Sequence, residues 1–355
     1  MATVSNSIFQ ESEKTNQTPP CHVLTEDSQP LPNLPRDIMV EVLSRLPVKS
    51  LLGLRCACKS WRSLISHPKF AKTHLSLAST NTDCTHHRLL LISWVPFYDA
   101  MSCSLHAVLH KHSDTAIELD CPFKGPHRVI RNMGSCDGLV CVAVERKVFL
   151  WNPSTRKFVT LPDAEMSYQY HPRYGLGYDE SIDDYKVVGF FCSSICYCEV
   201  QVMVYTLRSN SWRRIGDFPP RCFPQGVGTF VNGALHWIVS NESNDNIVSL
   251  DLAKETYGEV LGPEYGDGYL HEMLDVLNGC LCIVRYCNAC ADVWIMKEYG
   301  IRESWTKLVV IPYTLGLVLE DNKHARIHWM VYPVVKRAVY DVTFYRNSET
   351  RRSDS

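Results

Sequence analysis

The sequence predicts an α+β multidomain protein in which a small N-terminal helical module precedes a larger all-β, β-propeller-like domain. Between residues 31 and 78, hydrophobic residues recur at helical spacing. From about residue 85, short runs rich in β-branched and aromatic residues alternate with Gly, Asn, Asp and Pro. These runs form units that repeat every 45 to 54 residues, a period typical of propeller blades.

Composition is that of a globular protein. The chain has 355 residues, of which 45% are hydrophobic and 21% are charged, so one to three domains with a sizeable core are expected. A net charge of −2 argues against a protein that binds polyanions with its whole surface. We expect no membrane partner, because no run of 18 apolar residues is present. Residues 1–33 are polar and lack the apolar core of a secretory signal.

The sixteen cysteines do not indicate a disulfide scaffold. They are a small share of a chain long enough to bury its own core, and several, such as Cys141, Cys280 and Cys282, lie in apolar strand-like runs. Free cysteine in such a run behaves as a small hydrophobe. We therefore expect a reducing compartment, cytoplasmic and/or nuclear.

The helical module follows a polar tail. Residues 1–30, and also 346–355, are expected to be disordered tails. Asp37 is a plausible N-cap for the first helix, in which Ile38 and Val42 share one face. Pro47 ends this helix and can occupy the first position of the next.

The next part of the module predicts one continuous apolar stripe. Its members recur at steps of 3, 4, 3 and 4 residues, and Pro68 closes the segment. They are Leu51, Leu54, Cys58, Trp61 and Ile65. A segment this short rarely buries enough surface to be stable alone, so the stripe needs something to pack on. Residues 33–78 carry eight basic against two acidic side chains, a net +6 that leaves −8 for the rest of the chain.

Four units of the all-β region are clear in the sequence, and each ends in an aromatic residue. Phe158, Trp212, Tyr257 and Trp305 are separated by steps of 54, 45 and 48 residues. Each unit is expected to contain a hairpin turn, an inner strand, a second hairpin and this aromatic, packed between sheets. Residues 88–122 and 315–345 are weaker candidates that bring the count to about six blades. A β-sandwich is the alternative, because the period alone does not distinguish it.

Patterns that indicate metal or nucleic-acid binding are weak. Cys287 and Cys290 have the spacing of half a zinc ribbon, and Cys192, Cys196 and Cys198 form a second group. No second CxxC completes a four-ligand set, so hairpin or buried cysteines are the preferred interpretation and no metal is expected. The basic module lacks aromatic interleaving and turn-helix spacing, so no nucleic-acid partner is expected.

No catalytic motif or cofactor motif is found in the sequence. The chain has no G-x-S-x-G and no Walker loop, and Gly175-Leu176-Gly177 lacks the third glycine of a dinucleotide fingerprint. Asp183 and Asp184 are adjacent and are expected to be turn residues, and His236 is expected to pack within its blade. We therefore predict a protein that is not an enzyme, with no catalytic residue and no cofactor.

The helical module closely resembles an F-box of the plant type. The resemblance is carried by residues 34–51, LPRDIMVEVLSRLPVKSL, and by residues 58–70, CKSWRSLISHPKF. It implies a three-helix F-box at residues 31–78.

Residues 85–345 resemble the F-box-associated, kelch-like domain of plant F-box proteins. The shared segments are GSCDGL (134–139), WNPST (151–155), GLGYD (175–179), DYKVV (184–188), NGALHW (232–237) and WIMK (294–297). The Gly-Gly pair of a true kelch repeat is missing, so "kelch-like" refers here to the expected shape of the domain and not to the kelch sequence motif.

The resemblance implies a substrate-recognition subunit of an SCF-type ubiquitin ligase. Its partners are expected to be an acidic Skp-family adaptor, the cullin and RING subunits reached through that adaptor, and an unknown protein substrate. The expected adaptor-binding residues are Leu34, Pro35, Ile38, Val42, Leu43, Leu46, Pro47, Leu51, Leu54, Trp61, Leu64 and Ile65.

The substrate itself cannot be inferred from the sequence. Loops set propeller specificity, and those at 166–173, 192–199 and 219–226 are the candidates, with Tyr168, Tyr170 and His171 as substrate-binding residues. The alternative is a propeller that binds a small ligand or glycan and carries a repurposed F-box. Exposed aromatics with converging polar groups at one mouth of the propeller favour this alternative, whereas a broad surface with a charged rim favours the receptor.

Overall fold

The chain divides into two compact units, Met1–Asn81 and Thr82–Ser355. We call their described parts the helical module and the β-domain. The computed structural model describes residues 35–80, 88–92, 100–104, 117–123, 130–165, 172–192, 200–216, 218, 223–240, 245–264, 269–277, 279–287, 290–312, 325–326, 339–343 and 345–346. No helix within these ranges is both long and apolar enough to cross a bilayer.

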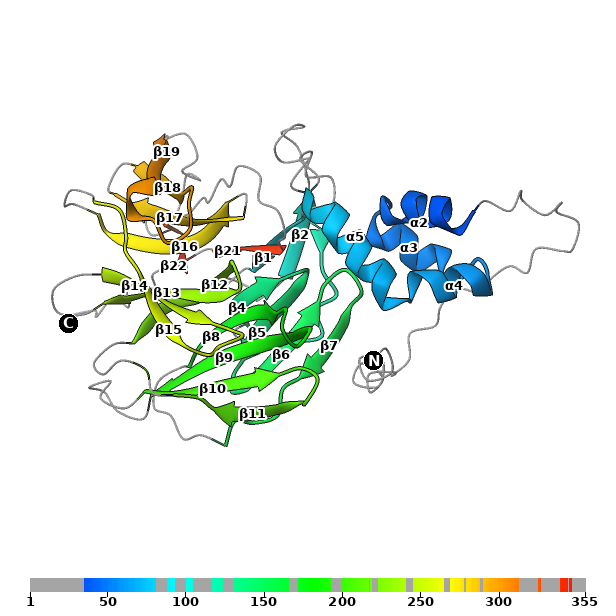
Figure 1. Cartoon of the computed structure of the whole chain (residues 1–355), viewed down its shortest axis with the longest axis horizontal. Helices are drawn as coiled ribbons and strands as arrows, with labels where there is room; N and C mark the ends of the chain where they lie inside the picture. The colour runs from blue at the N-terminus through cyan, green and yellow to red at the C-terminus, as the bar shows by residue number, and fades with distance from the viewer. Residues whose placement is uncertain are drawn as a thin grey trace, which may run out of the picture. The chain divides into compact units, whose positions relative to one another are not determined.

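The helical module contains four helices in its described residues (Figure 1). They are α2 (Arg36–Ser44), α3 (Val48–Leu54), α4 (Lys59–Ile65) and α5 (Pro68–Thr80). The expectation of three helices is wrong because Pro68 does not end the module. It is the first residue of α5, a position where proline's missing N–H leaves no hydrogen bond unmade.

The expected continuous stripe is also wrong, because it is divided between α3 and α4. Cys58 adopts an extended conformation, with φ −156° and ψ 164°, and stops the helical path. Its Sγ accepts a hydrogen bond from the backbone N–H of Trp61 at 3.4 Å. A cysteine thus has the N-cap role that serine or aspartate usually fills.

Two helix starts differ by one or two residues from the sequence prediction. Pro35, not Asp37, is the N-cap of α2, and Asp37 lies in the first turn. In that turn its negative charge still interacts favourably with the positive end of the helix dipole. Pro47 caps α3 instead of occupying its first position.

The β-domain is built from antiparallel units of up to four strands that follow chain order (Figure 1). We number these units as blades; two of them are joined by one parallel strand pairing into an eight-stranded sheet. Blade 2 contains β4 (Ile130–Cys136), β5 (Leu139–Val144), β6 (Lys147–Asn152) and β7 (Lys157–Thr160); blade 3 contains β8 (Arg173–Asp179), β9 (Asp184–Cys192), β10 (Val200–Thr206) and β11 (Ser211–Arg214). Blade 4 contains β12 (Pro224–Val231), β13 (Ala234–Ser240), β14 (Asp245–Asp251) and β15 (Tyr257–Val260); blade 5 contains β16 (His271–Leu277), β17 (Cys280–Tyr286), β18 (Cys290–Met296), the 3₁₀ helix η1 (Arg302–Ser304) and β19 (Trp305–Pro312).

This meander order confirms the propeller-like prediction. Each blade is a simple up-and-down sheet, as in a propeller, whereas sandwiches are connected as Greek keys. The β-sandwich alternative is therefore not supported.

Blade 1 joins the two ends of the β-domain in one sheet. It contains β1 (Arg88–Ile92), β2 (Ala100–Ser104) and β3 (Ile117–Glu118), and β21 (Val339–Thr343) pairs in parallel with β1. Residues 315–345, expected to form a separate blade, contribute β21 to this sheet. They also contribute β20 (Ala325–Arg326), which pairs with β22 (Tyr345–Arg346). The described residues thus form five blades and one two-stranded pair, against an expectation of about six blades.

The Asp-Gly and Asn-Gly pairs form the predicted tight turns. Asp137 and Gly138 have φ values of 53° and 80°, and Asn232 and Gly233 have 53° and 76°. Positive φ at both central residues is what a two-residue hairpin requires. In each case the turn joins the first and second strands of its blade.

The inner strand of each of these blades is the first one, before the tight turn. We expected the inner strand to come after the turn. The first strands of blades 3 and 4 meet in parallel, with Gly175 beside Gly228. A Cβ on Gly228 would lie 2.7 Å from the Gly175 Cα and 2.5 Å from the Trp237 ring. Gly134 in blade 2 is also confined, though less tightly, since its Cβ would lie 3.1 Å from the Leu176 backbone nitrogen. Glycine therefore allows the inner strands of blades 2, 3 and 4 to approach each other.

The closing aromatics tie neighbouring blades together, as predicted. Trp212 Nε1 donates to the Pro162 carbonyl at 2.7 Å. The Tyr257 hydroxyl donates to the Gly216 carbonyl at 3.2 Å, and Trp305 Nε1 donates to the Leu261 carbonyl at 2.9 Å. Each acceptor lies four residues after the closing aromatic of the preceding blade.

Cysteines contribute to the core as small apolar side chains. Cys141 and Cys282 are fully buried in β5 and β17, and Cys280 is half-buried. All three are free thiols. Burial raises the pKa of the Cys141 thiol. The thiol therefore stays protonated and unreactive, and its role is to fill the core.

Candidate functional site

The helical module has a small core of its own. Leu43, Leu51, Leu64 and Phe70 are at most 8% exposed and pack together. The Leu46 carbonyl is also bonded to His74 Nε2 at 2.9 Å, which ties the end of α2 to α5.

The twelve expected adaptor-binding residues divide into core and surface. Leu43, Leu51 and Leu64 lie in the core, and Leu34 lies outside the described residues. Half-buried side chains that pack against the core are Leu46, Leu54, Trp61 and Ile65. Exposed side chains are Pro35, Ile38, Val42 and Pro47. Helical periodicity could not make this division, because both groups are apolar.

An apolar face on α2 is left open to solvent. Ile38 is 45% and Val42 is 54% exposed. They are four residues apart and so lie on one side of α2, whose N-cap is Pro35. Side chains of this kind gain free energy when a partner covers them.

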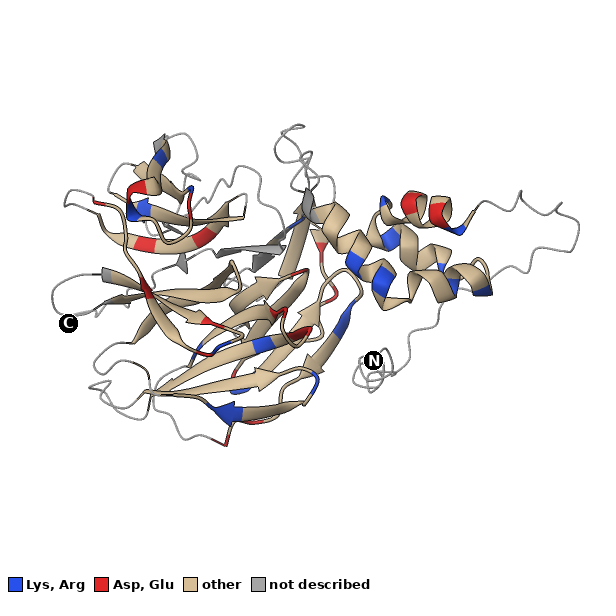
Figure 2. Ribbon diagram, in the orientation of Figure 1, with Lys and Arg blue, Asp and Glu red and all other residues tan. Residues whose placement is uncertain are grey.

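Charged residues surround the helices of the module. Figure 2 shows Lys and Arg distributed over the module and acidic residues on α2. The described module retains all eight basic residues found in the sequence, and seven of them are exposed. Arg45 and Glu41 form an exposed i,i+4 pair at 3.0 Å, which contributes little to stability. The net charge of the module therefore faces solvent.

The described residues that flank the predicted substrate loops lie at one end of the β-domain. Because each blade is a meander, its first and third strands begin at this end and its second and fourth strands finish there. Cys192, Val200 and Phe223 are such flanking residues. Tyr168, Tyr170 and His171 lie outside the described residues, but the described chain resumes beside them at Pro172 and Arg173. We call this end the loop end.

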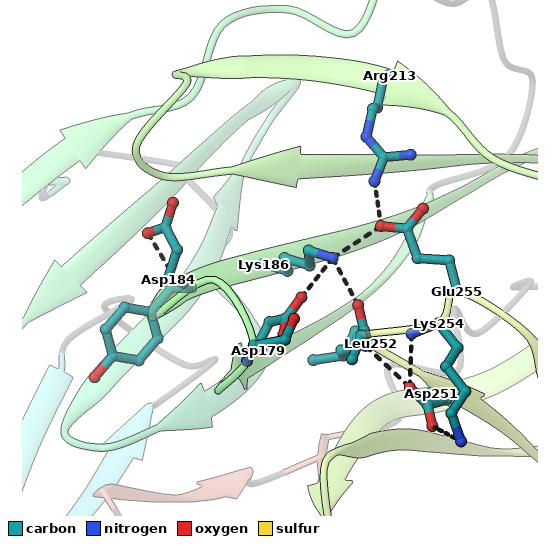
Figure 3. A network of polar contacts seen from close by, with 11 residues as sticks. Asp179, Asp184, Lys186, Arg213, Asp251, Leu252, Lys254 and Glu255 are labelled. Carbon is teal, nitrogen blue, oxygen red and sulfur yellow. Dashed lines mark hydrogen bonds and ion pairs between the residues drawn. The ribbon is translucent and has the colours of Figure 1, made fainter.

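A buried ion-pair network lies at the opposite end, between blades 3 and 4 (Figure 3). Lys186 Nζ lies 2.8 Å from Asp179 Oδ2, 2.8 Å from Glu255 Oε1 and 2.6 Å from the Leu252 carbonyl. Arg213 binds Glu255 as well. The only signal for it in the sequence is a lysine within the apolar run of β9.

The network is neutral overall and holds the two blades together. Burial alone would raise the pKa of the Asp179 carboxyl, but hydrogen bonds from Lys186 and Ser181 hold it below its usual value. The pKa of Glu255 is likewise lowered against burial, by Arg213 and Lys186. Both acids are thus ionised partners of fixed cations, so they are poorly suited to accept a proton from a substrate.

The other candidates for chemistry have structural partners. Asp184 accepts hydrogen bonds from the backbone N–H groups of Tyr185 and Arg208, and Asp183 lies in the preceding turn with φ 53°. The prediction of a turn residue is confirmed for Asp183, whereas Asp184 is already the first residue of β9. His236 is fully buried, and its ring nitrogens contact the Thr229 carbonyl at 3.2 Å and the Tyr299 hydroxyl at 2.8 Å.

Cys287 and Cys290 face each other across the β17–β18 hairpin. The Cys287 N–H donates to the Cys290 carbonyl at 2.8 Å. In the described part of the chain, no three His, Cys, Asp or Glu side chains gather in a way that would hold a metal ion. Cys196 and Cys198 lie outside the described residues.

Two family models match the chain. The F-box domain matches residues 31–73, and the F-box associated beta propeller domain matches residues 94–328. The first coincides with α2 to α4 and the start of α5, and the second covers all of blades 2 to 5.

Similar proteins from Arabidopsis thaliana cover most of the chain. "F-box/kelch-repeat protein At3g23880" is 35% identical over 292 residues, which are 79% of this chain and 80% of that protein. "F-box protein CPR1" is 31% identical over 312 residues, 78% of this chain and 73% of that protein. "F-box protein At3g07870" is 30% identical over 321 residues, 81% and 74% of the two chains. The chain therefore belongs to the plant F-box proteins that carry an F-box-associated β-propeller domain.

Proposed function

We propose that this protein is the substrate-recognition subunit of an SCF-type ubiquitin ligase. The observation that carries the proposal is the uncovered apolar face of α2 within a basic F-box. Ile38 and Val42 are about half exposed there, although the module buries only a small core. A face of this kind is a docking surface for a Skp-family adaptor.

Apolar contact and charge have different roles in this docking. Ile38 and Val42 supply most of the affinity, because a few buried anchors dominate the energy of an interface. The surrounding lysines and arginines accelerate the encounter with an acidic adaptor and select it over other partners. The salt dependence of binding is therefore expected mainly in the association rate.

The β-domain binds the protein to be ubiquitinated, and the chain itself catalyses nothing. Its contribution is proximity, because a substrate lysine held near a charged conjugating enzyme reacts as an intramolecular group. Cullin and RING subunits are reached through the adaptor. The residues that touch the substrate are expected at the loop end, near Tyr168, Tyr170 and His171.

The alternative of a ligand- or glycan-binding propeller finds no support among the described residues. Exposed aromatics with converging polar groups at one mouth of the propeller would favour it. The exposed tyrosines that the structure describes are Tyr269 and Tyr299. Tyr269 precedes β16 at the loop end, whereas Tyr299 lies between β18 and β19 at the opposite end.

Co-purification with a purified plant Skp adaptor tests the proposal. The full chain is compared with an Ile38→Ser, Val42→Ser variant, which removes the exposed anchors without entering the core. Each anchor is expected to contribute about 2 kcal/mol, or about thirtyfold in Kd. We expect the wild type to bind one adaptor per chain and the double variant to lose the complex.

A matched control keeps the result specific. Ile182 is 42% exposed in the β8–β9 turn, close to the exposure of Ile38. Ile182→Ser is expected to bind the adaptor as the wild type does. A folded wild-type chain that fails to bind, or a double variant that binds equally well, would refute the proposed docking face.

A further inference from the structure

Arg173 lies at the loop end of the β-domain and has no polar partner among the described residues. It is the first residue of β8 and is half-buried, and its Nε is inaccessible to solvent. Within the part of the chain that the structure describes, this guanidinium forms no hydrogen bond and no ion pair. The β-domain arginines Arg88, Arg156, Arg208, Arg213, Arg285 and Arg302 each form one.

Arg173 lies beside a cluster of aromatic side chains and contacts one of them, Phe223. It lies opposite Phe190 in the β8–β9 register, so both side chains project from the same face of blade 3. The Phe190 ring packs against the rings of Phe218 and Trp237, at 5.0 and 4.8 Å between centroids. The Arg173 guanidinium carbon lies 5.9 Å from the centroid of Phe223, which directly precedes β12.

This arrangement is costly unless a ligand uses it. A guanidinium carries five N–H donors, and removing one of them from water without an acceptor loses free energy. The cation–π contact with Phe223 recovers a part of that loss, but it leaves the donors unused. A guanidinium that rests on a ring still presents its edge to a planar oxyanion, which it binds through two parallel hydrogen bonds.

The geometry points to Arg173 as an oxyanion-binding residue of the substrate surface, taking a carboxylate or a phosphorylated side chain of a protein. The inference rests on the proposed function, because it specifies what the β-domain recognises. Its position agrees with the expected substrate surface, since Arg173 is two residues along the chain from His171 and lies at the loop end with Cys192, Val200 and Phe223. It also lies at the junction of blades 3 and 4, where one substrate segment can contact both blades.

The test uses the full chain and four pools of immobilised twelve-residue peptides. The pools are degenerate except at one central position, which is Glu, Gln, phosphoserine or Ser. The wild type is expected to retain the Glu pool over the Gln pool, or the phosphoserine pool over the Ser pool, at least tenfold. The preferred pair identifies the oxyanion as carboxylate or phosphate.

Three variants show whether Arg173 is responsible. Arg173→Gln is expected to abolish the preference, and Arg173→Lys to keep less than a third of it, because an ammonium cannot form the two parallel bonds. Arg208→Gln is the matched control. It removes an arginine from the opposite end of the same blade and is expected to keep the preference.

Stability distinguishes a binding role from a structural one. If the guanidinium is held ready for a ligand, Arg173→Met leaves the thermal midpoint of the β-domain unchanged or raises it. A large fall in that midpoint would instead mark a structural cation–π contact and overturn the inference. So would a wild type without preference for either oxyanion, or an Arg173→Gln variant that retains it.

Failure of this inference and failure of the proposed function give different results. Adaptor binding by the same preparations tests the docking face alone. A wild type that binds the adaptor but no oxyanion refutes only the role of Arg173. A wild type that does not bind the adaptor refutes the receptor function.

Discussion

Single glycines decide whether the inner strands of the β-domain can meet. A Cβ on Gly228 has no room, because it would lie 2.5 Å from the Trp237 ring and 2.7 Å from the Gly175 Cα. Gly228→Ala is therefore expected to destabilise the β-domain by about 2 kcal/mol or more, as overpacking does. Urea unfolding followed by tryptophan fluorescence measures this change.

Gly53 is the matched control, with the opposite expected sign. It lies within α3, and a Cβ there would have no neighbour within 4 Å. Gly53→Ala is expected to stabilise the helical module by about 0.5–1 kcal/mol, since alanine loses less backbone entropy in a helix. Equal effects of the two substitutions would show that the inner strands are not in close contact.

His236 makes the stability of the β-domain depend on pH. Burial lowers its pKa to about 4, whereas an unfolded histidine titrates near about 6.5. The unfolded state therefore binds the proton first, and stability falls as the pH decreases from about 6.5 towards 4. Between pH 7 and 5 the expected loss is about 2 kcal/mol.

Chemical denaturation of the wild type and of His236→Gln at these two pH values measures the effect. The carboxylates titrate in both proteins, so the difference between the two curves isolates the histidine. A wild type that loses no more stability than the variant would mean that His236 is protonated in the folded state or reaches water.

At the scale of elements, the blades are tied by their closing aromatics. The Tyr257 hydroxyl reaches the Gly216 carbonyl of the preceding connection. Tyr257→Phe keeps the ring and removes the hydroxyl that forms this bond, so a loss of about 1 kcal/mol in unfolding free energy is expected. Trp212→Phe should cost more, because the indole also packs against Tyr174, Phe191 and Tyr205.

Equilibrium unfolding of the two variants measures these ties. Hydrogen exchange at the amides of β11 and β15 shows which strands lose stability. Faster exchange in the outer strands is expected, since these are the strands that the aromatics attach to the neighbouring blade. No change for Tyr257→Phe would indicate that water replaces the carbonyl at no cost.

For the whole molecule, two separate units predict two unfolding transitions. The helical module has only four fully buried apolar side chains in its core, whereas several larger clusters stabilise the β-domain. The module is expected to melt first. If it binds a Skp adaptor, adaptor at 100 times its Kd should stabilise this transition by about 2.7 kcal/mol and leave the other unchanged.

Calorimetry of the full chain with and without adaptor tests this prediction. Gly53→Ala identifies the module's transition and Gly228→Ala that of the β-domain, because each substitution acts on one unit. A single transition that shifts as a whole would mean that the two units unfold cooperatively.

The order of elements and their kind could be predicted from local patterns. Turn chemistry at Asp137-Gly138 and Asn232-Gly233, the repeated closing aromatics, and the helical spacing around Ile38 and Val42 all depend on neighbours in the chain. Local patterns do not locate the breaks between helices. Nothing in the periodicity distinguishes a cysteine inside a helix from one that caps it, so the spacing alone predicts a continuous stripe through Cys58.

What the sequence by itself determined was the helical module, the all-β repeats and the family to which both belong, because these depend on short-range patterns. Only the tertiary structure decided which apolar side chains of α2 face solvent, since Leu43 and Val42 are alike until one of them is buried. It alone brought Lys186 to Glu255, which lies 69 residues along the chain. Among the described residues, it alone left Arg173 without a polar partner. Burial and pairing are properties of contacts between distant segments, and no local pattern encodes them.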